Sequence, residues 1–78
     1  MKNITVAGIP AQNYGSNNYS QGMEVIIFNP KDISVEKVKE LPNVFLHPAC
    51  EPNELEIFAL LGTVEQFERF YEDTISSF

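Results

Sequence analysis

Two segments of the chain share one pattern, in which a strand-like run leads into a helix start of the form Ser/Thr-Val-Glu. The first helix start is Ser34-Val35-Glu36 and the second is Thr63-Val64-Glu65, and apolar residues follow each one at helical spacing. Two strand-like segments precede each helix. The chain is therefore expected to run strand, strand, helix, twice over, which is an α+β arrangement.

The bounds of these elements follow from the alternation of side chains along strands, from residues that cap helices and from prolines that end an element. Ser34 and Thr63 are predicted N-caps, and Gln66 completes a capping box with Thr63. Pro42 closes the first helix. The predicted strands cover residues 2–7, 23–28, 44–47 and 54–61, and the predicted helices cover residues 35–41 and the segment from residue 64 onward.

Residues 23 onward read strand, helix, strand, strand, helix, which is a ferredoxin-like sandwich without its last strand. The strand at residues 2–7 can fill the vacant place beside the strand at 23–28. We therefore expect a single domain over residues 1–78, a circularly permuted ferredoxin-like fold with a four-stranded antiparallel sheet and two helices on one face. The alternative is a sheet of the same elements in a different strand order.

In this fold one face of the sheet is apolar and uncovered. Placing Val25 and Ile27 with Leu55 and Ile57 under the helices leaves the other side chains on the open face. That open face is expected to bind a second subunit or a partner, because monomers seldom expose large apolar patches. A shift of one strand by one residue would exchange the two faces. The expected oligomer face consists of Ile26, Phe28, Phe45, Phe58 and Leu60, with His47 beside them.

The segment at residues 10–22 contains neither helical nor strand periodicity, so it is predicted to be a long flexible loop. Its tyrosines lie among small polar residues, a composition typical of adaptable binding loops. A connector whose tyrosines pack back on the domain is the alternative. The candidate binding residues in this loop are Tyr14, Asn17, Asn18 and Tyr19.

The net charge of −6 lies entirely in the last part of the chain. Residues 1–49 sum to zero, whereas in residues 50–78 Arg69 is the one cation among the acidic side chains. This balance argues against direct nucleic-acid binding and favours a partner with a basic surface; solubility is the simpler reading. The candidate contact residues on the last helix are Glu65, Glu68, Glu72 and Asp73.

His47 and Cys50 are the only neighbouring pair of reactive side-chain types. A Cys–His pair can form a nucleophile or half of a zinc site, but no further ligand or orienting residue is marked. Glu54 and Glu56 could act as a carboxylate pair, but nothing apolar is placed to raise one pKa selectively, so a solvated strand face is the better explanation. We therefore expect no catalytic residues, no metal and no cofactor.

The sequence thus predicts a small, acidic, non-enzymatic interaction protein, a regulator or inhibitor of a partner with a basic surface, for which a nucleic-acid-handling protein is one candidate. The alternative is a dimeric sensor of a small ligand, with the loop at 10–22 as its lid. One cysteine and no apolar run of about 20 residues predict a cytoplasmic protein outside the membrane.

Overall fold

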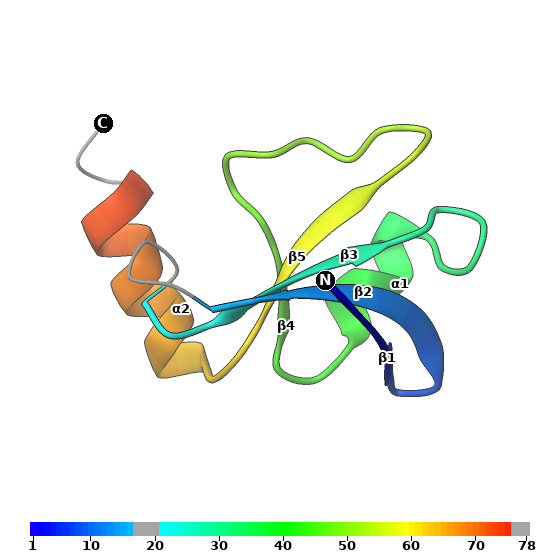
Figure 1. Ribbon diagram of the computed structural model, residues 1–78. Helices are drawn as coiled ribbons and strands as arrows, with labels where there is room; N and C mark the ends of the chain where they lie inside the picture. The colour runs from blue at the N-terminus through cyan, green and yellow to red at the C-terminus, as the bar shows by residue number, and fades with distance from the viewer. Residues whose placement is uncertain (17–20, 76–78) are drawn as a thin grey trace.

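The computed structural model describes residues 1–16 and 21–75. It shows a small α+β fold built on one five-stranded antiparallel sheet, with two helices packed against it (Figure 1). Along the chain the elements are β1 (Lys2–Val6), β2 (Ile9–Gly15), β3 (Glu24–Phe28), α1 (Val35–Glu40), β4 (Val44–Leu46), β5 (Ile57–Leu61) and α2 (Val64–Phe70), followed by a π-helical turn, η2 (Tyr71–Ile75).

The strands lie in the order β1-β2-β3-β5-β4. Three successive strands, β1, β2 and β3, form a meander, and β5 then lies between β3 and β4. Because β3 and β4 both run antiparallel to β5, they are parallel to one another, and α1 forms the crossover between them. The expected strands at residues 2–7, 23–28 and 44–47 are confirmed as β1, β3 and β4, and the strand expected at 54–61 is confirmed only from Ile57 onward.

The expected loop at residues 10–22 is wrong in its first half, because Ile9–Gly15 forms β2. β2 takes the place beside β3 that the N-terminal strand was expected to fill, so the sheet has five strands instead of four. Ala7 and Gly8 make the turn before it, both with positive φ (51° and 83°), as a two-residue β-hairpin requires. The second half of the expected loop, residues 17–20, lies outside the described residues.

Pro10 lies inside β2, although proline is depleted in strands. Pro10 is opposite Thr5 on β1, one residue before Ala11 pairs with Phe28 at the end of β3. In the alternating pattern of an antiparallel ladder, the nitrogen of Pro10 therefore points to the β3 side, just beyond the last paired residue of β3. A proline costs no ladder hydrogen bond at such a position.

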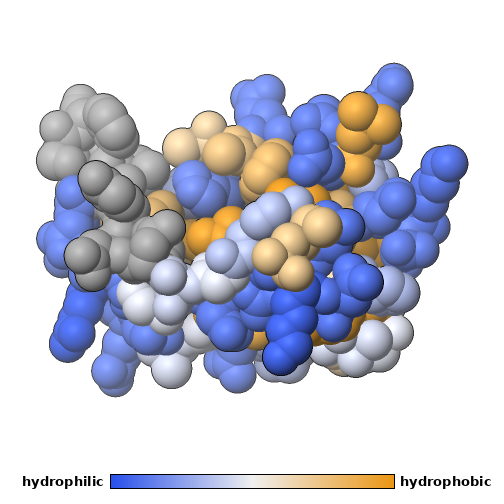
Figure 2. All heavy atoms as spheres, viewed as in Figure 1, coloured by the Kyte–Doolittle hydropathy of each residue, from blue (hydrophilic) through white to orange (hydrophobic). Residues whose placement is uncertain are grey.

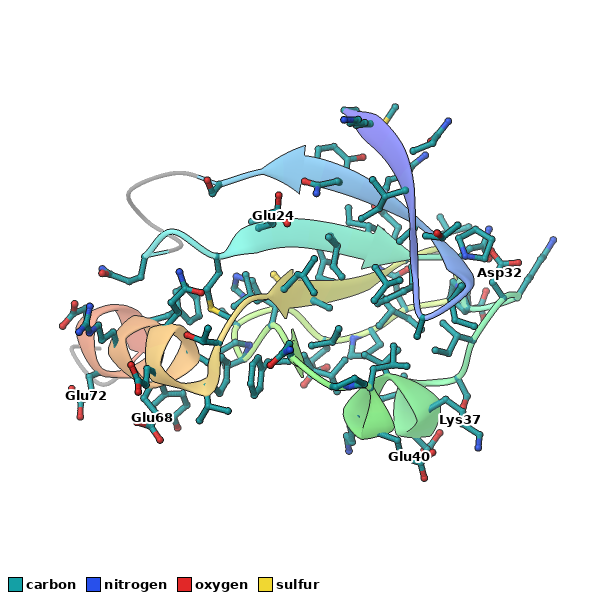
Figure 3. The ribbon with its side chains drawn as sticks, turned by 90° about the horizontal axis from the view of Figure 1, so that it is seen from below. Glu24, Asp32, Lys37, Glu40, Glu68 and Glu72 are labelled. Carbon is teal, nitrogen blue, oxygen red and sulfur yellow. The ribbon has the colours of Figure 1, made fainter. Side chains whose placement is uncertain are left out.

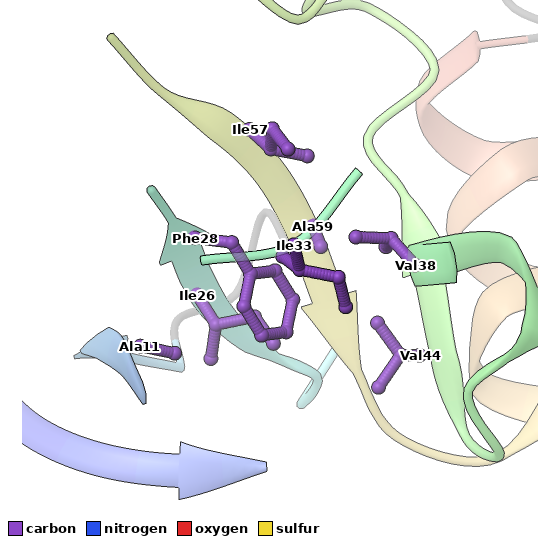
Figure 4. Close-up of a cluster of buried hydrophobic side chains, with 8 residues drawn as sticks. All are labelled: Ala11, Ile26, Phe28, Ile33, Val38, Val44, Ile57 and Ala59. Carbon is purple, nitrogen blue, oxygen red and sulfur yellow. The ribbon is translucent and has the colours of Figure 1, made fainter. Parts of the chain in front are cut away.

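One face of the sheet packs against α1 and the segment before it (Figure 4). Ile33, which precedes α1, and Val38, in α1, are both buried in this cluster. The strands contribute every second residue, in agreement with the register that pairs Ile26 with Ala59 and Phe28 with Ile57. This α1-side core consists of Ala11, Ile26, Phe28, Ile33, Val38, Val44, Ile57 and Ala59.

The opposite face packs against α2. Phe45, from β4, stacks on Phe67 with ring centroids 4.4 Å apart, while its neighbour Val44 belongs to the α1-side core and its neighbour Leu46 packs against that core. The two helices therefore lie on opposite faces, and the expected arrangement with both on one face is wrong. This α2-side core consists of Met23, Leu60 and Phe70, with Val25, Phe45 and Phe67 packed against it.

The expected oligomer face is divided between the two sides by this arrangement. Ile26 and Phe28 point toward α1, whereas Phe45, Phe58 and Leu60 lie on the face that carries α2. Ile26, Phe28 and Leu60 each have no exposed surface. The error is a one-residue shift between the strands, because Val25 and Ile27 pair with Leu60 and Phe58 and do not share a face with Ile57.

Both predicted helix starts are confirmed. The hydroxyl of Ser34 accepts a hydrogen bond from the Lys37 N–H (3.3 Å), and Thr63 and Gln66 form the complete capping box. None of the helices in the described part of the chain is long and apolar enough to cross a membrane.

Candidate functional site

The outward side of α2 and η2 is the most acidic part of the structure. Phe67 and Phe70 turn inward, the first half-buried and the second only 3% exposed. The acidic side chains are left on the solvent side, where Glu68 and Glu72 project away from the sheet (Figure 3). We call this surface the acidic helix face; it consists of Glu65, Glu68, Glu72 and Asp73, all exposed.

Little positive charge balances this surface. Arg69 is the one basic residue of α2 and η2. Glu65 and Glu68 form no ion pair with any residue that the structure describes. By contrast, Glu40 on α1 lies 3.4 Å from Lys37, and Lys39 is also on that helix. The acidic helix face therefore concentrates part of the charge asymmetry seen in the sequence, and such a surface attracts cationic groups; the other acidic residues of 50–78, Glu51, Glu54 and Glu56, lie in the segment before β5.

Of the candidate binding residues from the expected loop, the structure describes one and leaves three outside its described ranges. Tyr14 lies in β2, is 50% exposed, and its hydroxyl donates a hydrogen bond to Oε1 of Gln12 (3.3 Å). The turn and bulge around it are held by Asn13, whose side chain accepts a hydrogen bond from the Gly15 N–H (2.6 Å). Asn17, Asn18 and Tyr19 lie outside the described residues, so a role for them in binding stays a prediction.

A groove of about 480 Å³ lies on the α2-side face of the sheet, at the end of β3 distant from α2. The strands contribute Asn3, Gln12 and Ile27, and the adjoining segments contribute Asp32, Leu55 and Glu56. Figure 2 shows apolar atoms in the upper middle of the visible face, with hydrophilic atoms around them. Leu55 is 77% exposed although the sequence indicated a core position, because β5 begins only at Ile57.

Sequence reasoning missed this groove because it depends on β2. Asn3 and Gln12 are far apart in the sequence and directly opposite in the β1–β2 register. Gln12 in turn lies opposite Ile27 of β3. Ile9 and Ala11 begin an alternation of inward residues in β2, but the next two inward positions are Asn13 and Gly15, which are not apolar, so the strand was not evident from the sequence.

His47 has a structural role in the turn that follows β4. Its Nδ1 accepts a hydrogen bond from the Ala49 N–H (3.1 Å), which places the ring proton on Nε2, and its edge contacts Phe70 with ring centroids 5.5 Å apart. Burial lowers the pKa of His47 below its usual value of 6.5. The Cys50 N–H donates to the His47 carbonyl (3.2 Å), which closes the turn through the backbone.

Chemistry based on metal binding has no support among the described side chains. They contain no group of three or more His, Cys, Asp or Glu residues placed to hold a metal ion. Glu54 is exposed and Glu56 is half-buried. The backbone of this segment is fixed by Asn53, whose Oδ1 accepts hydrogen bonds from the Leu55 and Glu56 N–H groups (2.7 and 2.9 Å).

In comparisons with known proteins, no family model matches this chain, and no curated protein or solved structure matches it. What the protein binds is therefore inferred from its own side chains and their arrangement.

Proposed function

We propose that the protein is a non-enzymatic interaction module, a regulator or inhibitor, that binds a partner with a basic surface. The observation that carries this proposal is the acidic helix face. α2 packs on the sheet through Phe67 and Phe70, so its carboxylates project to the solvent side together. A partner that normally handles nucleic acid fits best, because its binding surface is already arranged for a row of negative charges.

The spacing of the acidic residues supports contact with an extended basic surface. Glu65 and Glu68 are three residues apart and lie on neighbouring turns of α2, on the same side of the helix. Both belong to a helix whose N-terminus is fixed by the Thr63–Gln66 capping box, so the backbone that carries them is helical before binding. Electrostatic complementarity of this kind sets the association rate and the choice of partner.

The proposal is tested with a lysine- and arginine-rich peptide as the probe, by calorimetric titration at several salt concentrations. The wild-type protein is expected to bind with an affinity that falls as salt rises. The double variant Glu65→Gln/Glu68→Gln is expected to bind several-fold more weakly. The matched control is Glu36→Gln/Glu40→Gln, which removes the same charge from α1, where Lys37 and Lys39 are neighbours.

Equal weakening in the two double variants would contradict the proposal, because it would show a response to net charge and not to one surface. Binding that does not depend on salt would contradict it as well.

The groove favours a second candidate function, a small-ligand sensor. Its volume of about 480 Å³ lies within the range of small-molecule sites, and amide and carboxylate side chains line it together with Ile27 and Leu55. In this version the ligand binds between the sheet and the segment before β5. Thermal stabilisation by members of a metabolite panel, lost in Gln12→Leu, would support this candidate over the first.

We also propose that the unit from β3 to β5 is related to the split βαβ unit of ferredoxin-like folds. The support is the order β3-β5-β4, with α1 as the crossover between two parallel strands. A cytoplasmic location is likewise proposed, supported by the single unpaired cysteine, Cys50.

A further inference from the structure

The outer side of β1 is an open edge of the sheet. β1 pairs with β2, and no other described residue continues the ladder beyond it. Val6 and Ile9 close the two-residue turn, so they form a hydrogen-bonded pair in the ladder. By alternation Ile4 and Lys2 also point their backbone groups toward β2. The N–H and C=O groups of Asn3 and Thr5 therefore point outward.

This edge lacks several of the features that protect edge strands from pairing. β1 contains neither proline nor a bulge, and three of its residues, Ile4, Thr5 and Val6, are β-branched. Lys2 is the only charged side chain among residues 1–23. An exposed edge of this kind readily accepts another strand.

We propose that the edge of β1 pairs with the β1 strand of a second copy of this chain, antiparallel and centred on Ile4. In that register Asn3 of one copy is opposite Thr5 of the other. These are the two residues whose backbone groups point outward, so each pair exchanges both of its hydrogen bonds. The two sheets then form one continuous sheet across the dimer.

The side chains agree with this register. Ile4 is opposite Ile4 of the second copy as a non-hydrogen-bonded pair, with Cα atoms about 4.5 Å apart. Ile4 is only half-buried in the single chain, where it packs beside the α1-side core, and the pairing would cover its remaining surface. Lys2 is opposite Val6, so the two lysines do not face each other.

Charge favours a second copy at this edge over the basic partner of the acidic helix face. Residues 1–23 contain no acidic side chain, so the two β1 edges meet without opposed carboxylates. β1 contains no acidic residue that could form an ion pair with a basic strand of another protein. The inference is therefore independent of the proposed function, and the two can fail separately.

Analytical ultracentrifugation over a range of concentrations tests the proposal. The wild-type chain is expected to approach twice its 8.8 kDa mass as its concentration rises. Thr5→Pro removes an outward N–H and no hydrogen bond of the β1–β2 ladder, so it is expected to remain folded and monomeric. Thr5→Val, which keeps that N–H, is expected to dimerise like the wild type. A wild-type mass of 8.8 kDa at all concentrations would overturn the proposal.

A cross-linking experiment tests the register without depending on the proline variant. In a Cys50→Ser background, Ile4→Cys places two thiols opposite each other at a distance suited to a disulfide. Mild oxidation is expected to yield a covalent dimer. Val6→Cys in the same background is the control, because Val6 is opposite Lys2 and not itself. Equal cross-linking of the two variants, or none of Ile4→Cys, would contradict the proposed pairing.

Discussion

Phe45 of β4 and Phe67 of α2 stack almost in parallel, with ring centroids 4.4 Å apart and an angle of 7° between the ring planes. This contact fixes α2 on the face of the sheet opposite α1. Val44 and Leu46, on either side of Phe45, pack toward α1. A strand of three residues is thus covered on both faces, and the acidic side of α2 is held away from the sheet.

The Phe45–Phe67 stack is expected to contribute a coupling free energy of about 0.5–1.5 kcal/mol beyond burial alone. A double-mutant cycle with Phe45→Leu and Phe67→Leu, followed by urea unfolding, measures this coupling. The control cycle pairs Phe67→Leu with Ile57→Val, which lies in the α1-side core; its effects are expected to add. Additivity in the first cycle would show that the stack has no special role.

The elements that the sequence predicted best are those with local signals. The caps at Ser34 and Thr63 depend on residues three positions apart, and both were predicted correctly. β2 was missed because two of its inward positions are Asn13 and Gly15, so the apolar alternation that begins at Ile9 does not continue past Ala11.

The faces of the central strands were assigned wrongly for a different reason. The run from Val25 to Phe28 is apolar at every position because helices and adjoining segments cover both sides of the sheet. Such a run contains no information on which residues point to which face. The acidic positions on α2 were predictable, since they follow helical periodicity, whereas the groove required the register of β1, β2 and β3.

Gly62→Ala is expected to destabilise the protein by about 1 kcal/mol. A Cβ at Gly62 would lie 2.6 Å from Oε1 of Gln66 and 3.1 Å from Cγ of Met23. Oε1 of Gln66 accepts a hydrogen bond from the Thr63 N–H (3.0 Å), and the Gln66 side chain would have to give up this hydrogen bond to make room for the new Cβ. Thermal or urea unfolding measures the loss. In a Gln66→Ala background the same glycine substitution should cost less, and an unchanged cost would argue against this mechanism.

Ala7→Asn is expected to stabilise the protein by about 0.5–1 kcal/mol. Ala7 adopts φ of 51°, which asparagine tolerates better than alanine, and Asn-Gly is the preferred pair for this two-residue turn. Ala7→Val should lower stability, because a β-branched residue resists positive φ. Melting temperatures of the three proteins are expected to rank Asn, Ala, Val, and any other order would mean that the turn is not under this strain.

The stability of the protein is expected to fall with acidification because of His47. Burial lowers the pKa of His47 in the folded state below 6.5, so between these two pKa values the unfolded state binds more protons. Stability is therefore full above the unfolded pKa and decreases as pH falls toward the folded pKa. Urea unfolding from about pH 7.5 to about pH 5.5 measures the slope. His47→Asn, which keeps an acceptor for the Ala49 N–H, should reduce the dependence of the free energy of unfolding on pH. The same dependence in the variant and the wild type would show that other groups cause it.

In the proposed function, the outward carboxylates of α2 form the surface that binds the basic partner. Amide chemical-shift mapping of the labelled protein, titrated with the lysine- and arginine-rich peptide, tests it most directly. Chemical-shift changes are expected to concentrate on α2 and η2, around Glu65, Glu68 and Glu72, and to diminish as salt is added. Shifts confined to α1 or to the groove around Gln12 and Ile27 would contradict it.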